Sequence, residues 1–272
     1  MSHDAIQKIN PALDLPDFMR GVEPEGTEAL KEYVIPSRVK IVQKQSADEL
    51  LEQFNAGDVI IVPTGDLIAP IPVNDQGKPN GEKGFFKITP IFFYPEWISW
   101  NPIEVRESEN AIRYRTVDRN DPVVKKARTQ ALRQEPHPVV QDKMISHTEH
   151  LNFLCMIQSD VFVTDEPVVL SFSRTSHACG SKLSQLIRMR KAPIYGCVFD
   201  MHVYKESNAK GSWYTFEVSN PADGSAFVTS KEKFEAYGEL HKEFVRLHAD
   251  SLIQTQYDDE VSSGLDTGDS DF

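Results

Sequence analysis

The sequence predicts a mainly β fold with accessory helices, and three features of the chain lead to that prediction. Residues 84–100 are dense in aromatic and β-branched side chains, which favour strands. Residues 194–204 and 211–218 flank a turn-forming stretch at 206–210, in the pattern of a β-hairpin. Residues 230–252 repeat apolar side chains every three or four positions, which predicts one amphipathic helix.

The first half of the chain is expected to form short strands separated by loops. The pattern predicts a half-buried strand at 33–43, a short helix at 47–54, a buried strand at 58–63 and a loop at 65–84. Pro90 and Pro95 predict that 84–100 is an edge strand or is broken into pieces, because proline cannot donate to a strand ladder. The alternating segment 110–117 is its expected partner.

The second half adds helices between strands. A basic helix is expected at 123–134, strands at 151–157 and 167–174, and a helix at 180–191. This order, with an inserted helix and a C-terminal capping helix, fits an OB-like Greek-key barrel, and a β-sandwich fits it too. We therefore predict an acidic N-terminal arm (1–33), an OB-like core (34–228), an amphipathic helix (229–253) and a disordered acidic tail (254–272).

Charge is distributed unevenly along the chain. The 272 residues carry a formal net charge of −12, of which −6 falls in residues 258–272 and −4 in residues 1–33, so the remainder is almost neutral. Residues 167–199 contain five bases and no acid, and residues 113–143 contain eight bases and four acids. A basic surface on the core is therefore expected despite the acidic total.

Composition excludes several classes of protein. Hydrophobic residues at 40% and charged residues at 26% are typical of a globular chain. No apolar run approaches the ~18 residues of a membrane span, and the first residues lack the apolar region of a secretory signal. Cys155, Cys179 and Cys197 make an odd count without a C-x-x-C pair, which favours the reducing cytoplasm.

The C-terminal sequence Thr267-Gly-Asp-Ser-Asp-Phe272 closes an acidic tail on a single aromatic residue. It resembles the tails of single-stranded DNA-binding proteins of the bacterial and tailed-phage types. The resemblance implies a tail that competes with DNA for a basic groove and recruits replication partners. The tail residues concerned are Asp258, Asp259, Glu260, Asp269, Asp271 and Phe272. An acidic solubility tail with an incidental last Phe is the simpler alternative.

Aromatic residues interleaved with bases supply candidate contacts to a single strand, which needs rings for stacking and cations for phosphates. Trp100, Tyr114 and Trp213 are expected to be the exposed rings, whereas most other aromatics fill the core. The candidate nucleic-acid-binding residues are Trp97, Trp100, Arg113, Tyr114, Arg115, Arg119, Lys125, Lys126, Arg174, Lys182, Arg188, Arg190, Lys191, Tyr204, Lys205, Lys210 and Trp213.

Motifs for metals and catalysis are weak. His147, His150 and Cys155 are zinc-type ligands, but their spacing matches no zinc ribbon, finger or H-E-x-x-H helix, so no metal or other cofactor is expected. The loop 77–84 lacks the order of a P-loop, and no nucleophile elbow or dinucleotide fingerprint occurs. We expect a binding protein rather than an enzyme.

The hypothesis from sequence is a phage-type protein that coats single-stranded DNA with little sequence preference during replication or recombination. It would act in the host cytoplasm, form a homo-oligomer and recruit phage proteins through its tail. The alternative is a host-takeover or scaffold protein that binds a host polymerase or nuclease through acidic ends that mimic DNA. A metal-dependent nuclease, which would need converging carboxylates, is a third class.

Overall fold

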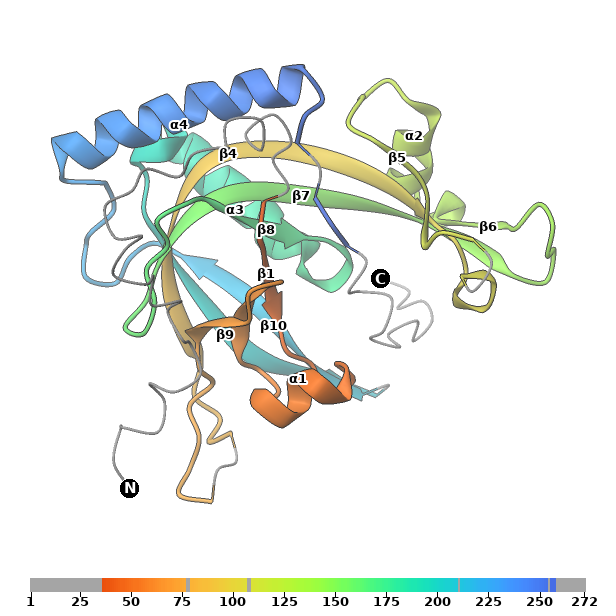
Figure 1. Ribbon diagram of the computed structural model, residues 1–272, viewed down its shortest axis with the longest axis horizontal. Helices are drawn as coiled ribbons and strands as arrows, with labels where there is room; N and C mark the ends of the chain where they lie inside the picture. Colours follow the sequence, from red (N-terminus) through yellow and green to blue (C-terminus); the bar gives the residue numbers. More distant parts are fainter. Residues whose placement is uncertain (1–35, 77–78, 107–108, 210, 254, 258–272) are drawn as a thin grey trace, which may run out of the picture.

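The computed structural model describes residues 36–257, apart from 77–78, 107–108, 210 and 254. Ten strands form one mixed sheet in the order β10-β9-β4-β7-β8-β1-β2-β3, with β5 paired to β4 and β6 to β7 (Figure 1). Only the β1–β8 pair is parallel among these strands. The strands are β1 (Arg38–Ile41), β2 (Val59–Val62), β3 (Asp66–Ala69), β4 (Gly84–Trp100), β5 (Ile112–Thr116), β6 (Gln134–Pro136), β7 (Met144–Gln158), β8 (Val168–Phe172), β9 (Phe199–Asn208) and β10 (Gly211–Ser219).

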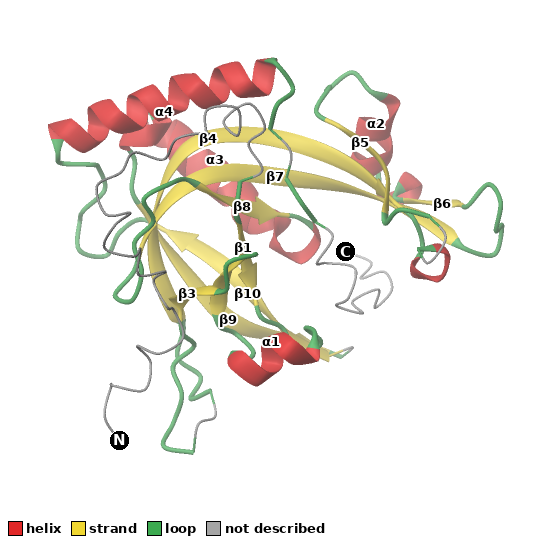
Figure 2. Ribbon diagram, viewed as in Figure 1, coloured by secondary structure: helices red, strands yellow, loops and turns green. Residues whose placement is uncertain are grey.

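The helices lie around this sheet rather than in a separate layer (Figure 2). The α-helices are α1 (Asp48–Gln53), α2 (Pro122–Arg128), α3 (His177–Arg190) and α4 (Lys231–Ala249). Four short 3-10 helices complete the described elements: η4 (Ile103–Val105), η5 (Gln130–Leu132), η6 (Arg174–Ser176) and η7 (Ile194–Gly196).

Strands β4 and β7 are the longest, and they run side by side along most of the molecule (Figure 1). β4 is continuous over 17 residues, so the prediction of a broken strand was wrong. Other strands pair with both sides of β4 at its two ends, so it is an edge strand only along its middle. Pro90 and Pro95 fall between the stretches paired with β9 and β5, where β7 is the only neighbour of β4 among the described strands. Proline therefore removes no donor from a ladder on that open edge. There His241 of α4 donates to the carbonyl oxygen of Ile91 across 2.8 Å.

The sheet curls around the main hydrophobic core, to which nearly all of its long strands contribute. Helix α3 packs against both β8 and β10, which are not neighbours in the sheet, and so bridges its two sides. Gly180 permits this approach, because a Cβ atom there would lie 2.7 Å from the Cβ of Phe172. The Gln43 side chain also joins the two sides, accepting from the Tyr214 N–H at 2.9 Å and donating to its carbonyl at 2.8 Å.

Helix α4 covers the outer surface of β4 and β7 (Figure 1). Ser230 caps its first turn by accepting a hydrogen bond from the Lys233 N–H, as an N-cap serine should. Phe244 and Leu247 point from its apolar stripe into a second cluster with Tyr94 and Leu154. The amphipathic pattern of 230–252 thus predicted both the helix and the face it buries.

Beyond this body, the ends of β4 and β7 carry β5, β6 and α2 (Figure 1). We call this part of the molecule the arm, and it is not the predicted N-terminal arm of residues 1–33. Asp121 caps α2 by accepting from the Val123 N–H. Glu149 of β7 joins the arm to α3: Arg128 donates to it at 2.8 Å, and His177 lies 3.3 Å away. Burial alone would raise the pKa of Glu149, but these two partners outweigh it and lower the pKa to about 2.

The mainly β architecture with accessory helices is confirmed, and an OB-type barrel is not confirmed by this strand order. The predicted helices at 47–54, 180–191 and 230–252 correspond to α1, α3 and α4, and the predicted hairpin to β9 and β10. The segment expected to be a loop at 65–84 contains β3. Among the described residues no helix is both long and apolar enough to cross a membrane.

Candidate nucleic-acid interface

A shallow groove lies on the arm beside β5. It is lined by Asn101, Arg106, Glu109, Asn110, Ile112, Arg113 and Tyr114. The Asn101 amide ties the wall together, donating to Glu109 at 3.0 Å and to the Asn110 carbonyl at 2.9 Å. Arg106 donates to the Asn101 carbonyl at 2.9 Å, which fixes its guanidinium at the groove. Two arginines and an aromatic ring therefore line one depression.

Tyr114 is the exposed ring of this groove, as predicted, with 46% of its surface accessible. Its hydroxyl donates to Asp121 at 2.5 Å, which anchors the side chain although much of its surface stays exposed. Beside it, an Arg113 Nη atom lies 3.3 Å from the Nε2 of buried His137 and 3.6 Å from Glu109. The pair combines a stacking surface with a phosphate donor, the two elements that single-strand binding needs.

The other basic side chains of the arm differ in whether a carboxylate pairs with them. Lys126 pairs with Glu135 at 2.6 Å. Arg119 and Lys125 are exposed, and within the described part of the chain no carboxylate lies within ion-pair distance of either. These two cations extend the basic surface from β5 towards α2.

Arg115 turns to the opposite face of β5 and makes a partly buried ion pair with Glu96 at 2.5 Å. Its Nη1 also donates to the carbonyl of Thr255 at 3.1 Å. Burial raises the pKa of Glu96, and the Arg115 charge opposes that rise. Arg115 is therefore committed to the interior, and its predicted contact with DNA has no support from its position.

The tryptophans do not form the expected stacking platforms. Trp97 is fully buried under Arg128, whose guanidinium lies 5.1 Å from the ring centre. The expectation that Trp100 is exposed was wrong: it is 4% accessible, and its indole N–H donates to Thr148 at 2.7 Å. Trp213 is half-buried, and so is Tyr204, which carries Lys83 over its ring.

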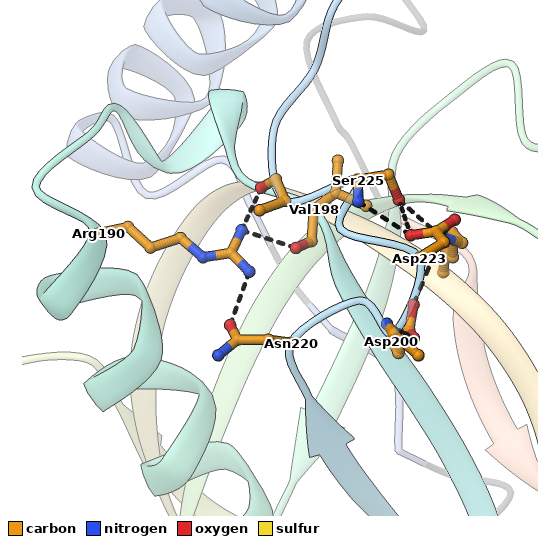
Figure 3. A network of polar contacts seen from close by, with 9 residues as sticks. Arg190, Val198, Asp200, Asn220, Asp223 and Ser225 are labelled. Carbon is orange, nitrogen blue, oxygen red and sulfur yellow. Dashed lines mark hydrogen bonds and ion pairs between the residues drawn. The ribbon is translucent and has the colours of Figure 1, made fainter.

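Helix α3 presents a second basic surface. Lys182, Arg188 and Lys191 are exposed, with no ion pair to a described acid, and Arg174 is exposed just before the helix. Arg190 behaves differently and ties α3 to the loop after β10 (Figure 3). It donates to the carbonyls of Val198 and Ala226 and to Asn220, and its guanidinium stacks on Phe199 at 3.9 Å. Its geometry indicates a structural role rather than the predicted DNA contact.

The candidate residues fall into separate surfaces rather than one groove. β9 pairs with the Gly84 end of β4, and the Tyr204–Lys205 end of the hairpin extends beyond it. β5 pairs with the Trp100 end, so Tyr114 and Trp213 are separated by most of a strand that is about 50 Å long at ~3.3 Å per residue. Lys210 and the tail residues Asp258, Asp259, Glu260, Asp269, Asp271 and Phe272 lie outside the described residues.

The possible zinc ligands do not converge. His147 and His150 lie on a strand rather than a helix, and their spacing of three puts them on opposite faces of β7. Cys155 is fully buried in the core. Among the described residues no group of three His, Cys, Asp or Glu side chains could hold a metal ion.

Of the residues that line the groove, sequence reasoning named Arg113 and Tyr114 and missed the others: Asn101, Arg106, Glu109, Asn110 and Ile112. Most of them lie in the connection between β4 and β5, where no periodic pattern shows which side chains line a surface. It also missed Tyr257, which falls in the predicted tail (254–272) but is fully buried. A tyrosine directly before an acidic run was the only available signal.

Comparison with known proteins returned one family. The model described as Pam3 phage gp34-like protein matches residues 8–249, most of the chain. No curated protein and no solved structure matches significantly.

Proposed function

We propose that this chain, which belongs to the Pam3 phage gp34-like protein family, binds single-stranded DNA with little sequence preference through the groove beside β5. The family is one of phage proteins, and phage DNA replication and recombination both expose single strands. The proposed role is binding rather than catalysis. The one observation that carries the proposal is Tyr114, an exposed ring held in a groove between arginines.

The chemistry of this groove suits a strand of any sequence. Every base has a π-face, and stacking on an aromatic side chain contributes about 1–3 kcal/mol per base. Arg106 and Arg113 lie where phosphates of the same strand would pass, and Arg119 and Lys125 continue the basic surface. Several hydrogen-bonding groups of the groove wall already bond one another, as the Asn101 amide does with Glu109 and with the Asn110 carbonyl. This arrangement favours binding by shape and charge over reading of base edges.

The exposed basic face of α3 would lengthen the stretch of DNA that the protein contacts. Lys182 and Arg188 lie on a helix without acids and Lys191 directly follows it, and together they could hold the backbone of a strand leaving the arm. Assembly into a homo-oligomer along DNA, a position in the host cytoplasm and recruitment of replication partners through residues 258–272 belong to the same proposal. They rest on the resemblance of the tail and on its charge of −6.

The test is the fluorescence anisotropy of a labelled oligo(dT) titrated with the full chain at several salt concentrations. Intrinsic tryptophan fluorescence is less suitable, because Trp97 and Trp100 are buried. Tyr114→Ala should weaken binding by about 5- to 150-fold, the equivalent of ~1–3 kcal/mol. Arg113→Gln should reduce the slope of log affinity against log salt by about 0.7, the value for one lost phosphate contact on a single strand.

Lys233→Gln is the matched control, because it removes one positive charge from the exposed side of α4, away from the groove. It should leave affinity and salt slope unchanged. Equal losses in the control and the groove variants would contradict the site. No binding by the folded wild-type chain would overturn the proposal and favour the host-takeover alternative, in which the acidic ends bind a host protein.

A further inference from the structure

The segment after α4 crosses the outer face of the sheet and ends in a buried tyrosine. Ile253 packs into the apolar cluster beneath α4. The Thr255 hydroxyl hydrogen-bonds that of Tyr94, and its carbonyl accepts from Arg115. Thr255 and Tyr257 are both fully buried, so this segment is packed as firmly as a core strand. We call it the strap (Leu252, Ile253 and Thr255–Tyr257).

Tyr257 occupies a chamber built from four strands, which we define by Arg38, Glu96, Trp100, Arg115, His150 and Asn152 and call the Tyr257 chamber. The ring centre of Tyr257 lies 4.7 Å from that of His150 and 6.0 Å from that of Trp100. The guanidiniums of Arg38 and Arg115 lie 5.6 and 5.8 Å from it. The ring is therefore enclosed by two π-systems and two cations.

The far end of the chamber accepts hydrogen bonds. The Tyr257 hydroxyl lies 3.0 Å from a Glu96 carboxylate oxygen and 3.1 Å from the Asn152 carbonyl oxygen. Both side chains are at least 97% buried. Two acceptors thus stand side by side at the bottom, although a tyrosine has a single proton to donate.

Burying the charged groups around the chamber costs free energy, and stability alone does not explain their presence. A buried ion pair such as Arg115–Glu96 is weak evidence for stability, since apolar side chains of similar volume often serve equally well. Burial, together with Arg174, Arg38, Arg115 and His177, holds the pKa of His150 well below its ordinary value, so its ring is neutral. Arg174 also has a left-handed backbone (φ 46°), a strained conformation that tends to persist at functional sites.

We propose that the Tyr257 chamber is a binding pocket for a nucleobase, guanine above the others, and that Tyr257 occupies it when no nucleic acid is bound. Guanine presents two adjacent donors, N1–H and the 2-amino group, to the Glu96 and Asn152 oxygens. Its ring would take the place of Tyr257 between Trp100, His150 and the two guanidiniums. The inference rests on the proposed function for its biological context. The chamber and the groove lie on opposite faces of β5, so a strand bound at the groove would supply the base by passing around this edge strand.

The experiment removes the occupant and measures a small ligand directly. Tyr257→Ala in the full chain should bind dGMP at least tenfold more tightly than the wild type does, measured by equilibrium dialysis. The gain should be smaller for dTMP, which offers one donor at its N3 position. Tyr237→Ala is the matched control, since it removes a partly buried tyrosine of α4 that lies outside the chamber, and dGMP binding should not change.

A folded Tyr257→Ala chain that shows no gain for dGMP over the wild type overturns the inference. If that variant does not fold, hydrogen exchange on Tyr257→Phe is decisive: dGMP should accelerate exchange of the strap amides, and an unchanged rate overturns the inference. The two proposals fail separately. If neither the wild type nor any variant binds oligo(dT), the proposed groove is wrong. dGMP binding to Tyr257→Ala tests the chamber alone.

Discussion

Arg190 and Arg188 are two residues apart on α3, and comparing their variants distinguishes an arginine needed for stability from one available for binding. Arg190 donates to the Val198 and Ala226 carbonyls and to Asn220 (Figure 3). Arg188 is exposed, and no described acid pairs with it. We therefore expect Arg190→Ala to destabilise the protein and Arg188→Ala to leave its stability unchanged.

The size of the effect follows from the contacts. Hydrogen bonds from a charged donor contribute about 1.5–3 kcal/mol each, and a guanidinium over a ring adds about 0.5–1 kcal/mol at a partly exposed site. The bonds of Arg190 share one guanidinium, and water can reach its outer side, so their contributions do not add fully. We expect a loss of about 3 kcal/mol in the free energy of unfolding, against less than ~0.5 kcal/mol for Arg188→Ala.

The assay is thermal unfolding followed by far-UV circular dichroism, with urea unfolding as the second measurement. For a chain of this size, about 3 kcal/mol corresponds to a fall in Tm of roughly 6–12 °C. Equal midpoints for the two variants would refute the structural role of Arg190. If the role is correct, Arg188→Glu alone is the better test of DNA binding by α3, because reversing Arg190 would confuse lost affinity with lost structure.

Three further predictions concern other parts of the molecule. Glu149 has a depressed pKa, so its stabilising contribution is complete above about pH 4.5 and is lost as pH falls towards 2; Glu149→Gln should flatten this part of the urea-midpoint profile, and an unchanged profile contradicts it. Gly180→Ala should destabilise by about 1–3 kcal/mol because its Cβ would overlap Phe172, despite the better helix propensity of alanine, whereas exposed Gln185→Ala should not; a stabilised Gly180→Ala would refute this packing. A chain ending at Tyr257 should bind oligo(dT) severalfold more tightly at low salt, because it lacks six competing acids; weaker binding would count against tail competition.

Sequence patterns predicted most of the elements because their signals are local. The alternation of 110–117 indicated β5, and the spacing of Phe244 and Leu247 indicated the buried face of α4. The position of β4 inside the sheet could not be predicted from its prolines. Pro90 and Pro95 are tolerated because no strand of the described part of the chain pairs with the edge opposite β7 along 89–96. That fact depends on where β9 and β5 end.

The candidate site was predicted only in part, for a similar reason. Tyr114 was correctly expected to be exposed because bases adjoin it, and the same argument failed for Trp100. Neighbours in sequence do not show that Thr148 of a distant strand accepts from the Trp100 indole. Likewise, the acid-free run around Arg190 suggested a DNA surface, whereas its partners are backbone carbonyls that carry no sequence signal.

The most direct test of the central claim is photo-crosslinking of the full chain to oligo(dT), with the crosslinked peptides identified by mass spectrometry. The account predicts adducts at Tyr114 on β5, which decrease as salt rises and as unlabelled strand competes. Adducts confined to the β9–β10 hairpin or α4, or none from a folded chain at low salt, would contradict binding at this groove.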